Sequence, residues 1–257
     1  MLIHPDIDPV AIAIGPLKIH WYGLMYLVGF LGGYAVGVWR ANKPGSGWRP
    51  EEIGDLLFYL AIGVIVGGRL GYALFYNAGH YLRAPHEILY LWSGGMSFHG
   101  GMIGVIIALW MYARRTRRPF LAVTDYVAVL APVGLGPGRI GNFINQELWG
   151  KPSELPWAMV FPRVDGVPRH PSMLYEAVLE GLVLFILLYG FATRRPETGR
   201  VSGLFLVAYA VFRFLIEFVR LPDAHIGYLA FGWLTMGQLL SVPMVALGLW
   251  LLFRRAA

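Results

Sequence analysis

The feature that most constrains this chain is a series of seven apolar stretches. Each is about the 20 residues that a helix needs to cross the ~30 Å hydrocarbon core of a bilayer. They lie at Ile19–Trp39, Leu56–Tyr76, Gly95–Ala113, Leu121–Phe143, Met173–Ala192, Val201–Val219 and Leu234–Phe253. Hydrophobic residues make up 57% of the 257 residues and charged residues only 14%, a balance unlike that of a soluble domain. We therefore predict an all-α integral membrane protein with seven transmembrane helices.

The fourth stretch is the least regular of the seven. It contains Pro132 and Pro137, and five glycines lie between Gly134 and Gly150. Proline removes a helical hydrogen bond, so a broken or re-entrant segment is an alternative to a continuous span here. Glycines four residues apart predict close helix contacts in the first two spans, at Gly29, Gly33 and Gly37 and at Gly63, Gly67 and Gly71.

Basic residues in the connections set the predicted orientation. They gather in alternate connections, at Arg40, Lys43 and Arg49, at Arg114, Arg115, Arg117 and Arg118, at Arg194, Arg195 and Arg200, and at Arg254 and Arg255. The positive-inside rule places these connections in the cytoplasm. We expect an external amino terminus, with residues 1–18 as a short external segment, and a cytoplasmic carboxyl terminus. The formal charge of +6 then marks cytoplasmic loops and anionic lipid contacts rather than nucleic acid.

Unusual polar residues fall toward the outer ends of the predicted spans. The set comprises His20, Tyr22, Arg69, Tyr72, Ser97, His99, Arg139, Asn142, His170, Glu176, Arg213, Glu217 and Arg220. The inner halves of the spans are almost purely apolar. Polar groups inside a membrane are costly and mark functional sites, so this asymmetry predicts a polar pocket open to the outer leaflet.

Arginine is the prominent residue of this pocket. Arg213, Glu217 and Arg220 are spaced i, i+4 and i+7, and Arg139 and Asn142 i and i+3, so each set shares a helix face. With Glu217 as the one well-placed carboxylate, and Glu147 and Glu176 expected nearer the interface, the arginines leave excess positive charge. A guanidinium fork suits phosphate. The alternative is that Arg213 and Glu217 form an ion pair that only holds helices together.

His99 lies in a glycine-rich stretch, Gly94 to Gly101, where the glycines clear space beside the imidazole. A lone histidine is most often structural, but its predicted depth makes His99 a candidate general base. Ser97 lacks the setting of a covalent nucleophile. The chain has no cysteine, and its histidines show no paired metal-ligand spacing. We predict no metal and no other cofactor.

Several blocks together carry a family resemblance. The segment from Gly138 to Gly150, read as Gly-Arg-x-Gly-Asn-Phe-x-Asn-x-Glu-x-x-Gly, resembles the signature of the bacterial phosphatidylglycerol:prolipoprotein diacylglyceryl transferases. Further blocks resemble that family in its order, at 20–23, 67–72, 94–101, 169–176 and 213–223. The likeness covers nearly the whole chain, although the loop after Trp149 is short for the family and Gln146 replaces a smaller residue.

The resemblance implies a seven-helix enzyme of the bacterial inner membrane, one transmembrane catalytic domain over residues 1–257. Such an enzyme moves diacylglyceryl from phosphatidylglycerol to the lipobox cysteine of a preprolipoprotein. A thioether forms and glycerol-1-phosphate leaves. The amino terminus, the active site and the loop region between spans four and five would face the periplasm.

Site residues follow from the resemblance and from the pocket. The expected catalytic residues are His99, Arg139, Arg213 and Tyr22. Substrate-binding residues are expected at Asn142, Gly150, Glu217, Arg69, Arg220, Ser97 and His170. From the residues alone, two other classes stay open: a transporter or lipid-binding protein that holds an anion without reaction, and a different transferase acting on phospholipid headgroups.

Overall fold

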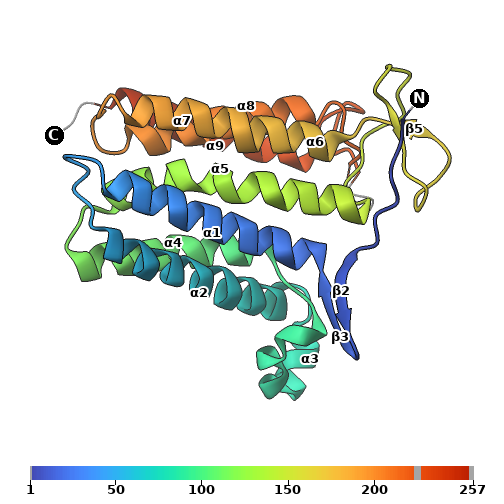
Figure 1. Cartoon of the computed structure of the whole chain (residues 1–257), viewed down its shortest axis with the longest axis horizontal. Helices are drawn as coiled ribbons and strands as arrows, with labels where there is room; N and C mark the ends of the chain where they lie inside the picture. Colours follow the sequence, from blue (N-terminus) through green and yellow to red (C-terminus); the bar gives the residue numbers. More distant parts are fainter. Residues whose placement is uncertain (1, 223–226, 255–257) are drawn as a thin grey trace. The chain divides into compact units, whose positions relative to one another are not determined.

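The computed structural model describes residues 2–222 and 227–254. The chain forms two compact units, one built from residues 1–33 and 125–257 and the other from residues 34–124. Helices α1 (Trp21–Ala41) and α5 (Phe120–Asn145) each continue from one unit into the other (Figure 1). The prediction of a single catalytic domain over residues 1–257 stays a prediction.

The first unit contains most of α5 and the carboxyl-terminal helices. A continuous helical segment runs through α6 (Ser172–Glu176), the π-helical η3 (Ala177–Val183) and α7 (Leu184–Ala192), and α8 (Arg200–Ile216) and α9 (Met236–Phe253) follow. Apolar side chains of α5, α7 and α8 form its buried core, among them Val129, Leu184 and Leu188. Gly203 lets α8 and α9 approach closely, since a Cβ there would lie 2.8 Å from the carbonyl oxygen of Gly248.

Short strands occur where the sequence analysis expected only loops. β1 (Leu2–Ile3) pairs in parallel with β4 (Met159–Val160), which pairs antiparallel with β5 (Pro168–Arg169). β2 (Val10–Ile14) and β3 (Leu17–His20) form a hairpin. The all-α prediction is therefore incomplete outside the spans. An extended segment outside the helices satisfies its backbone N–H and C=O groups by hydrogen bonding to another strand. The two strands can be far apart in the sequence, so helical periodicity does not reveal the pairing.

The fourth predicted span is one continuous helix, α5, with both prolines inside it. The alternative of a broken or re-entrant segment is therefore wrong. Neighbouring elements support α5 at its small residues: a Cβ on Gly29 of α1 would lie 3.0 Å from Gly134 Cα, and one on Gly181 would lie 2.8 Å from Gly136 Cα. Packing against other helices lets transmembrane helices tolerate proline.

The second unit is organised around the pairing of α2 (Pro50–Phe75) with α4 (Phe98–Thr116), two helices that pack over a long contact. Between them lie the short helices α3 (Ala78–Arg83), η1 (Pro85–Leu89) and η2 (Leu91–Ser93). A Cβ on Gly67 would lie 2.4 Å from Gly100 O, and one on Gly63 would lie 2.7 Å from Gly104 O. The predicted glycine contact of the second span is confirmed. In the first span Gly29 makes such a contact, but a Cβ on Gly33 would meet no described atom within 4 Å.

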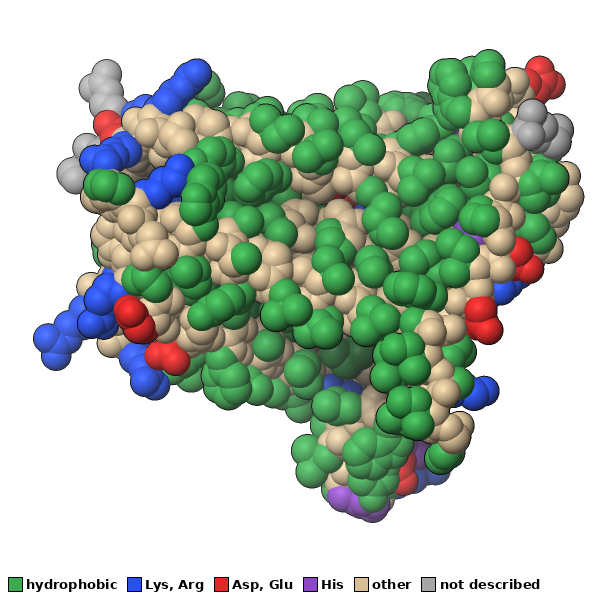
Figure 2. Space-filling view, viewed as in Figure 1, with side chains coloured by type: hydrophobic (Ala, Val, Ile, Leu, Met, Phe, Trp, Pro, Cys, Tyr) green, Lys and Arg blue, Asp and Glu red, His purple; other side chains and the backbone are tan. Residues whose placement is uncertain are grey.

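Within residues 2–222 and 227–254, five helices are long and apolar enough to cross a membrane, at Trp21–Ala41, Pro50–Phe75, Phe120–Asn145, Ser172–Ala192 and Met236–Phe253. The other two predicted spans correspond to α4, which ends in Arg114 and Arg115, and to α8, which has 17 residues. The protein is thus a mainly helical membrane protein. Figure 2 shows hydrophobic side chains along the helices and most visible Lys and Arg side chains at one end of each unit.

Contacts within each unit explain this basic end. In the first unit, Arg254 after α9 donates to the carbonyl of Thr198 before α8, at 2.9 Å. In the second, Arg118 after α4 pairs with Glu52 in the first turn of α2, at 2.8 Å. Basic residues from separate connections therefore gather at the same end of each unit. The polar residues Arg213 and Ser97 lie at the opposite ends of their helices.

Candidate active site

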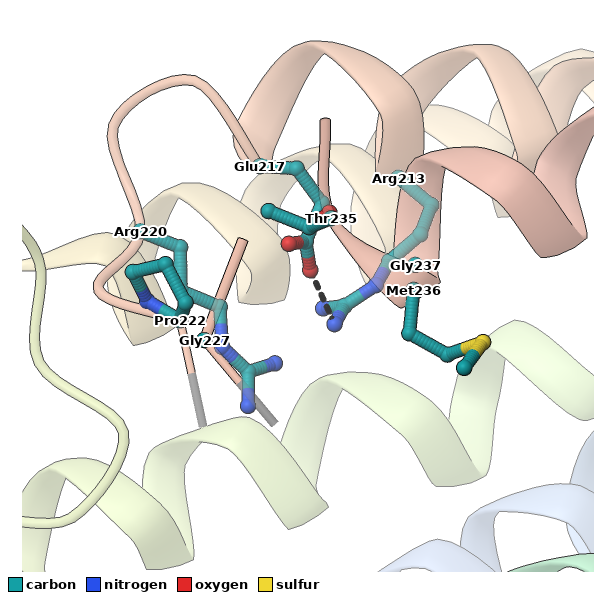
Figure 3. Close-up of a pocket in the computed structure, with 8 residues that line it drawn as sticks. All are labelled: Arg213, Glu217, Arg220, Pro222, Gly227, Thr235, Met236 and Gly237. Carbon is teal, nitrogen blue, oxygen red and sulfur yellow. Dashed lines mark ion pairs between the residues drawn. The ribbon is translucent and has the colours of Figure 1, made fainter. Parts of the chain in front are cut away.

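The end of α8 brings Arg213, Glu217 and Arg220 together, as their spacing predicts. Arg213 forms an ion pair with Glu217, and both line a small pocket of about 30 Å³ with Arg220 and the start of α9. Figure 3 shows the two arginine side chains extending to the same side of this pocket. A Cβ on Gly237 would lie 2.7 Å from Glu217 Oε1, so α9 reaches the carboxylate closely because this residue is glycine.

Glu176 contacts the three arginines Arg139, Arg213 and Arg220. Its Oε2 lies 2.9 Å from Arg139 Nε, and its Oε1 lies 3.0 Å from an Nη atom of Arg213 and 3.5 Å from one of Arg220. The side chain is completely buried. The expectation that Glu176 lies too near the interface to pair with Arg139 is wrong, because the fifth residue of α6, which begins after Pro171, contacts arginines of α5 and α8. Its depth in the membrane stays a prediction.

Glu180 is a site residue that the sequence analysis missed. It is fully buried, and its Oε2 lies 3.2 Å from an Nη atom of Arg139. Its signal in the sequence is the i, i+4 spacing from Glu176, which puts two carboxylates on one face of an otherwise apolar span. Glu180 lies in the π-helical stretch η3, and such stretches are frequent at functional sites.

These contacts change the predicted charge of the pocket. Arg139, Arg213 and Arg220 are matched by Glu176, Glu180 and Glu217, so the cluster is formally neutral when all six are ionised. The predicted excess of positive charge is therefore wrong for the first unit. The arginines are nevertheless held with their forks converging, and fixed guanidiniums of this kind suit a phosphate. We call these six residues the arginine–glutamate cluster.

The segment from Gly138 to Gly150 carries more than Arg139. Gly141 makes room for Tyr22, since a Cβ there would lie 2.8 Å from Tyr22 Cδ2. Tyr22 interacts with Asn142, and its hydroxyl lies 3.4 Å from that of Tyr26. Asn142 donates to Glu147 Oε2 at 3.3 Å. The signature thus places Tyr22 and Asn142 side by side at the end of α5.

Gln146, the departure from the family pattern, connects the amino-terminal segment to the loop between α5 and α6. Its side chain donates to Asp6 Oδ1 at 3.0 Å and accepts from the backbone N–H of Arg163 at 3.0 Å. Nearby, His4 Nδ1 accepts from the N–H of Asp6, so its Nε2–H donates to the carbonyl of Phe143 at 3.0 Å. Burial lowers the pKa of His4, which keeps this neutral tautomer.

Gly150 lies where three backbone segments meet. Its N–H donates to the carbonyl of His170 at 2.9 Å, and a Cβ would lie 2.6 Å from His170 Cβ and 2.7 Å from Val219 O. His170 Nδ1 lies 3.3 Å from the Tyr175 hydroxyl. Burial, and then the charge of Lys151, lower the pKa of His170. Close backbone approach is reason enough for glycine at 150, and its substrate-binding role stays a prediction.

Arg69 belongs to the second unit and makes different contacts from the other site arginines. It is 3% exposed, and all three of its guanidinium nitrogens donate within that unit. The acceptors are the carbonyls of Ile88, Glu87, Tyr90, Gly94 and Gly95 and the hydroxyl of Ser93. With its donors used in this way, Arg69 holds the loop that precedes α4, and its predicted role toward substrate stays a prediction.

His99 and Ser97 lie at the start of α4. Ser97 is the N-cap, and its hydroxyl accepts from the N–H of Gly100 at 3.1 Å. His99 is exposed in the first turn, with its ring 5.6 Å from that of Phe98. The expectation that the glycines clear space for substrate is only partly met, because Gly100 packs against α2 and Gly95 packs against the Tyr72 ring.

Together, these features define a class: a helical membrane protein in which arginines and glutamates form a buried polar cluster at one end of an apolar bundle. A family model described as prolipoprotein diacylglyceryl transferase matches residues 9–254. The chain belongs to this family.

Relatives agree along the whole chain. A protein of Nitratidesulfovibrio vulgaris is 59% identical over 254 residues, which covers 99% of this chain and 96% of the relative. One of Solidesulfovibrio magneticus is 56% identical over 258 residues, covering 100% and 97%, and one of Pseudomonas paraeruginosa is 55% identical over 260 residues, covering 100% and 98%. All three are named phosphatidylglycerol–prolipoprotein diacylglyceryl transferase.

Proposed function

We propose that this protein transfers the diacylglyceryl group of phosphatidylglycerol to the lipobox cysteine of preprolipoproteins. A bond forms between the cysteine sulfur and a glycerol carbon, and the bond from that carbon to the phosphate oxygen breaks. Glycerol-1-phosphate leaves with the electron pair. Family membership over nearly the full length supports this reaction and favours it over the transporter alternative.

The buried arginine–glutamate cluster is the observation that carries the assignment of roles. Arg139 and Arg213 hold the phosphate and stabilise the charge that develops on the leaving oxygen. Glu217 and Glu176, which contact Arg213 from two sides, orient its fork. Tyr22 and Asn142, adjacent at the end of α5, hydrogen-bond the headgroup, and Arg220 adds positive charge.

His99 accepts the proton of the attacking thiol in this proposal. Imidazole is the side chain most often used for proton transfer near neutral pH. The seven helices all cross the inner membrane, with the amino terminus and the cluster toward the periplasm. The basic end of each unit then lies in the cytoplasm, as the positive-inside rule requires.

A transfer assay tests the function. The purified protein, given phosphatidylglycerol and a peptide with a lipobox cysteine, is expected to add the mass of one diacylglyceryl group to the peptide. Arg139→Ala or Arg213→Ala should lower kcat/KM by about 10²–10³-fold, the loss found when one donor to a developing oxyanion is removed.

Arg200→Ala is the matched control, since Arg200 lies at the opposite end of α8 and pairs with the half-exposed Glu197. It should keep most of the activity. Absence of thiol modification by the folded protein contradicts the proposed reaction. Full activity of both cluster variants contradicts the phosphate-binding role.

A further inference from the structure

The six residues of the arginine–glutamate cluster cannot all keep their charges unchanged when a phosphodiester enters. The cluster is formally neutral, and the lipid phosphate adds one negative charge. An uncompensated charge at a membrane-buried site is costly. The arginine donors of the cluster already face carboxylates, so a phosphate that binds them competes with these carboxylates.

Of the carboxylates in the cluster, Glu180 is held least firmly by ion pairs with the arginines. Glu176 contacts three arginines, and Glu217 forms a close pair with Arg213. Among the residues that the structure describes, Glu180 contacts a single arginine, Arg139, at 3.2 Å. Its other oxygen, Oε1, is buried without a hydrogen-bond partner among the residues that the structure describes. A buried carboxylate oxygen left unpaired favours the protonated form of the group.

The neighbours of Glu180 act in opposite directions. Arg139 on α5 and Arg213 on α8 favour its ionised form, whereas Glu176 on α6 opposes it, and Tyr209 on α8 also lies within electrostatic reach. When a phosphate recruits Arg139, the main cationic partner of Glu180 is shared with a second anion. The balance then shifts toward the neutral acid.

We propose that Glu180 takes up one proton from solvent when the phospholipid anion binds, so that the cluster stays neutral with the headgroup in place. The proton adds to the free Oε1, and no covalent bond of the lipid changes in this step. Glu180 is thus a positioning residue that frees Arg139 to face phosphate. The inference rests on the proposed function, because it takes phosphatidylglycerol as the ligand.

Two properties follow from this coupling. Binding of phosphatidylglycerol alone, without peptide, consumes one proton per lipid. The affinity for the lipid therefore falls as pH rises, by up to tenfold per pH unit in the range where the free protein has Glu180 ionised. A glutamine at 180 imitates the neutral acid, so it removes this dependence and binds the lipid at least several-fold more tightly than glutamate at high pH.

Calorimetry on the intact protein measures the coupling. A short-chain phosphatidylglycerol is titrated at one pH in buffers of different ionisation enthalpy, which reports the protons taken up. Phosphatidylcholine of the same chain length is the control without net headgroup charge. The dissociation constant is then followed between pH 6 and 9 for the unmodified protein, for E180Q and for E180D, which keeps a titratable carboxyl.

The expected result is an uptake near one proton and a sloping affinity for the unmodified protein and E180D, with zero uptake and a flat affinity for E180Q. His99→Gln and His170→Asn should leave the slope in place, which excludes these two histidines as its source. Zero uptake by the unmodified protein, or an unchanged slope in E180Q, overturns the proposal. Zero uptake by the unmodified protein overturns the proposal even if E180Q fails to fold, and E180D then tests whether the carboxyl at 180 is the source.

The outcomes separate this inference from the function itself. If the protein neither binds phosphatidylglycerol nor modifies a lipobox thiol, the proposed function fails. If it does both without taking up a proton, only the role of Glu180 fails.

Discussion

Glu176 shows at the scale of one residue how a buried charge organises the site. Each of its oxygens contacts an arginine to which a catalytic role is assigned, Oε2 to Arg139 and Oε1 to Arg213. Removing one partner of a buried ion pair costs about 3–5 kcal/mol, since the other charge is left uncompensated. Here the charges left behind belong to Arg139 and Arg213, the groups that we propose hold the phosphate.

Glu176→Gln should therefore abolish most activity, with kcat/KM lowered at least 100-fold. The glutamine amide removes the negative charge and places an N–H₂ donor against the N–H donors of an arginine. Steady-state transfer kinetics on the folded variant measure the effect, and Glu176→Asp should recover part of the loss. Glu197→Gln is the control, because that carboxylate is half-exposed and pairs with Arg200, where an ion pair contributes little. Wild-type kinetics for Glu176→Gln contradict this role.

At the scale of elements, glycines decide which helices touch. The backbones of α2 and α4 approach so closely at Gly67 that a Cβ would lie 2.4 Å from Gly100 O, whereas a Cβ on Gly54 of the same helix would meet nothing within 4 Å. Close packing of small residues is a main source of helix association in membranes. This contact also places the start of α4, where His99 lies, beside the end of α2.

Gly67→Ala should lower the unfolding temperature in detergent and destabilise the protein by about 1–3 kcal/mol, the usual cost of overpacking. Gly54→Ala makes the same chemical change on α2 without the clash and should be neutral or slightly stabilising, because alanine is the better helix former. Thermal unfolding followed by circular dichroism compares the two. Equal unfolding temperatures for both variants argue against the contact.

At the scale of the whole molecule, the distribution of charge sets the orientation in the membrane. Four connections carry most of the basic residues, and contacts within each unit collect them at one end. In the seven-span topology proposed here, the positive-inside rule predicts that these connections face the cytoplasm.

A reporter fused after Arg118 should accordingly behave as cytoplasmic, and one placed within residues 151–169 as periplasmic. Alkaline phosphatase and green fluorescent protein fusions give opposite readouts for the two sides. A periplasmic signal after Arg118 rules out the seven-span topology proposed here.

The sequence by itself determined the features that depend on local pattern. Apolar length indicated the helices, and arginine spacing predicted the shared face of Arg213, Glu217 and Arg220. Glycine spacing predicted a close helix contact of the second span, but not that α4 is the partner. Hydrophobicity and helical periodicity act over a few residues, so they can be read without the fold.

Only the tertiary structure decided how charges pair. Glu176 and Glu180 come from a different helix than either Arg139 or Arg213, and no spacing along the chain states that these faces meet. The same holds for Arg69, whose partners lie 18–26 residues further along the chain. Ion pairing depends on distances of a few ångströms between side chains of separate elements, and the packing of those elements sets the distances. For this reason the sequence predicted an excess of positive charge, whereas the folded chain has a balanced cluster.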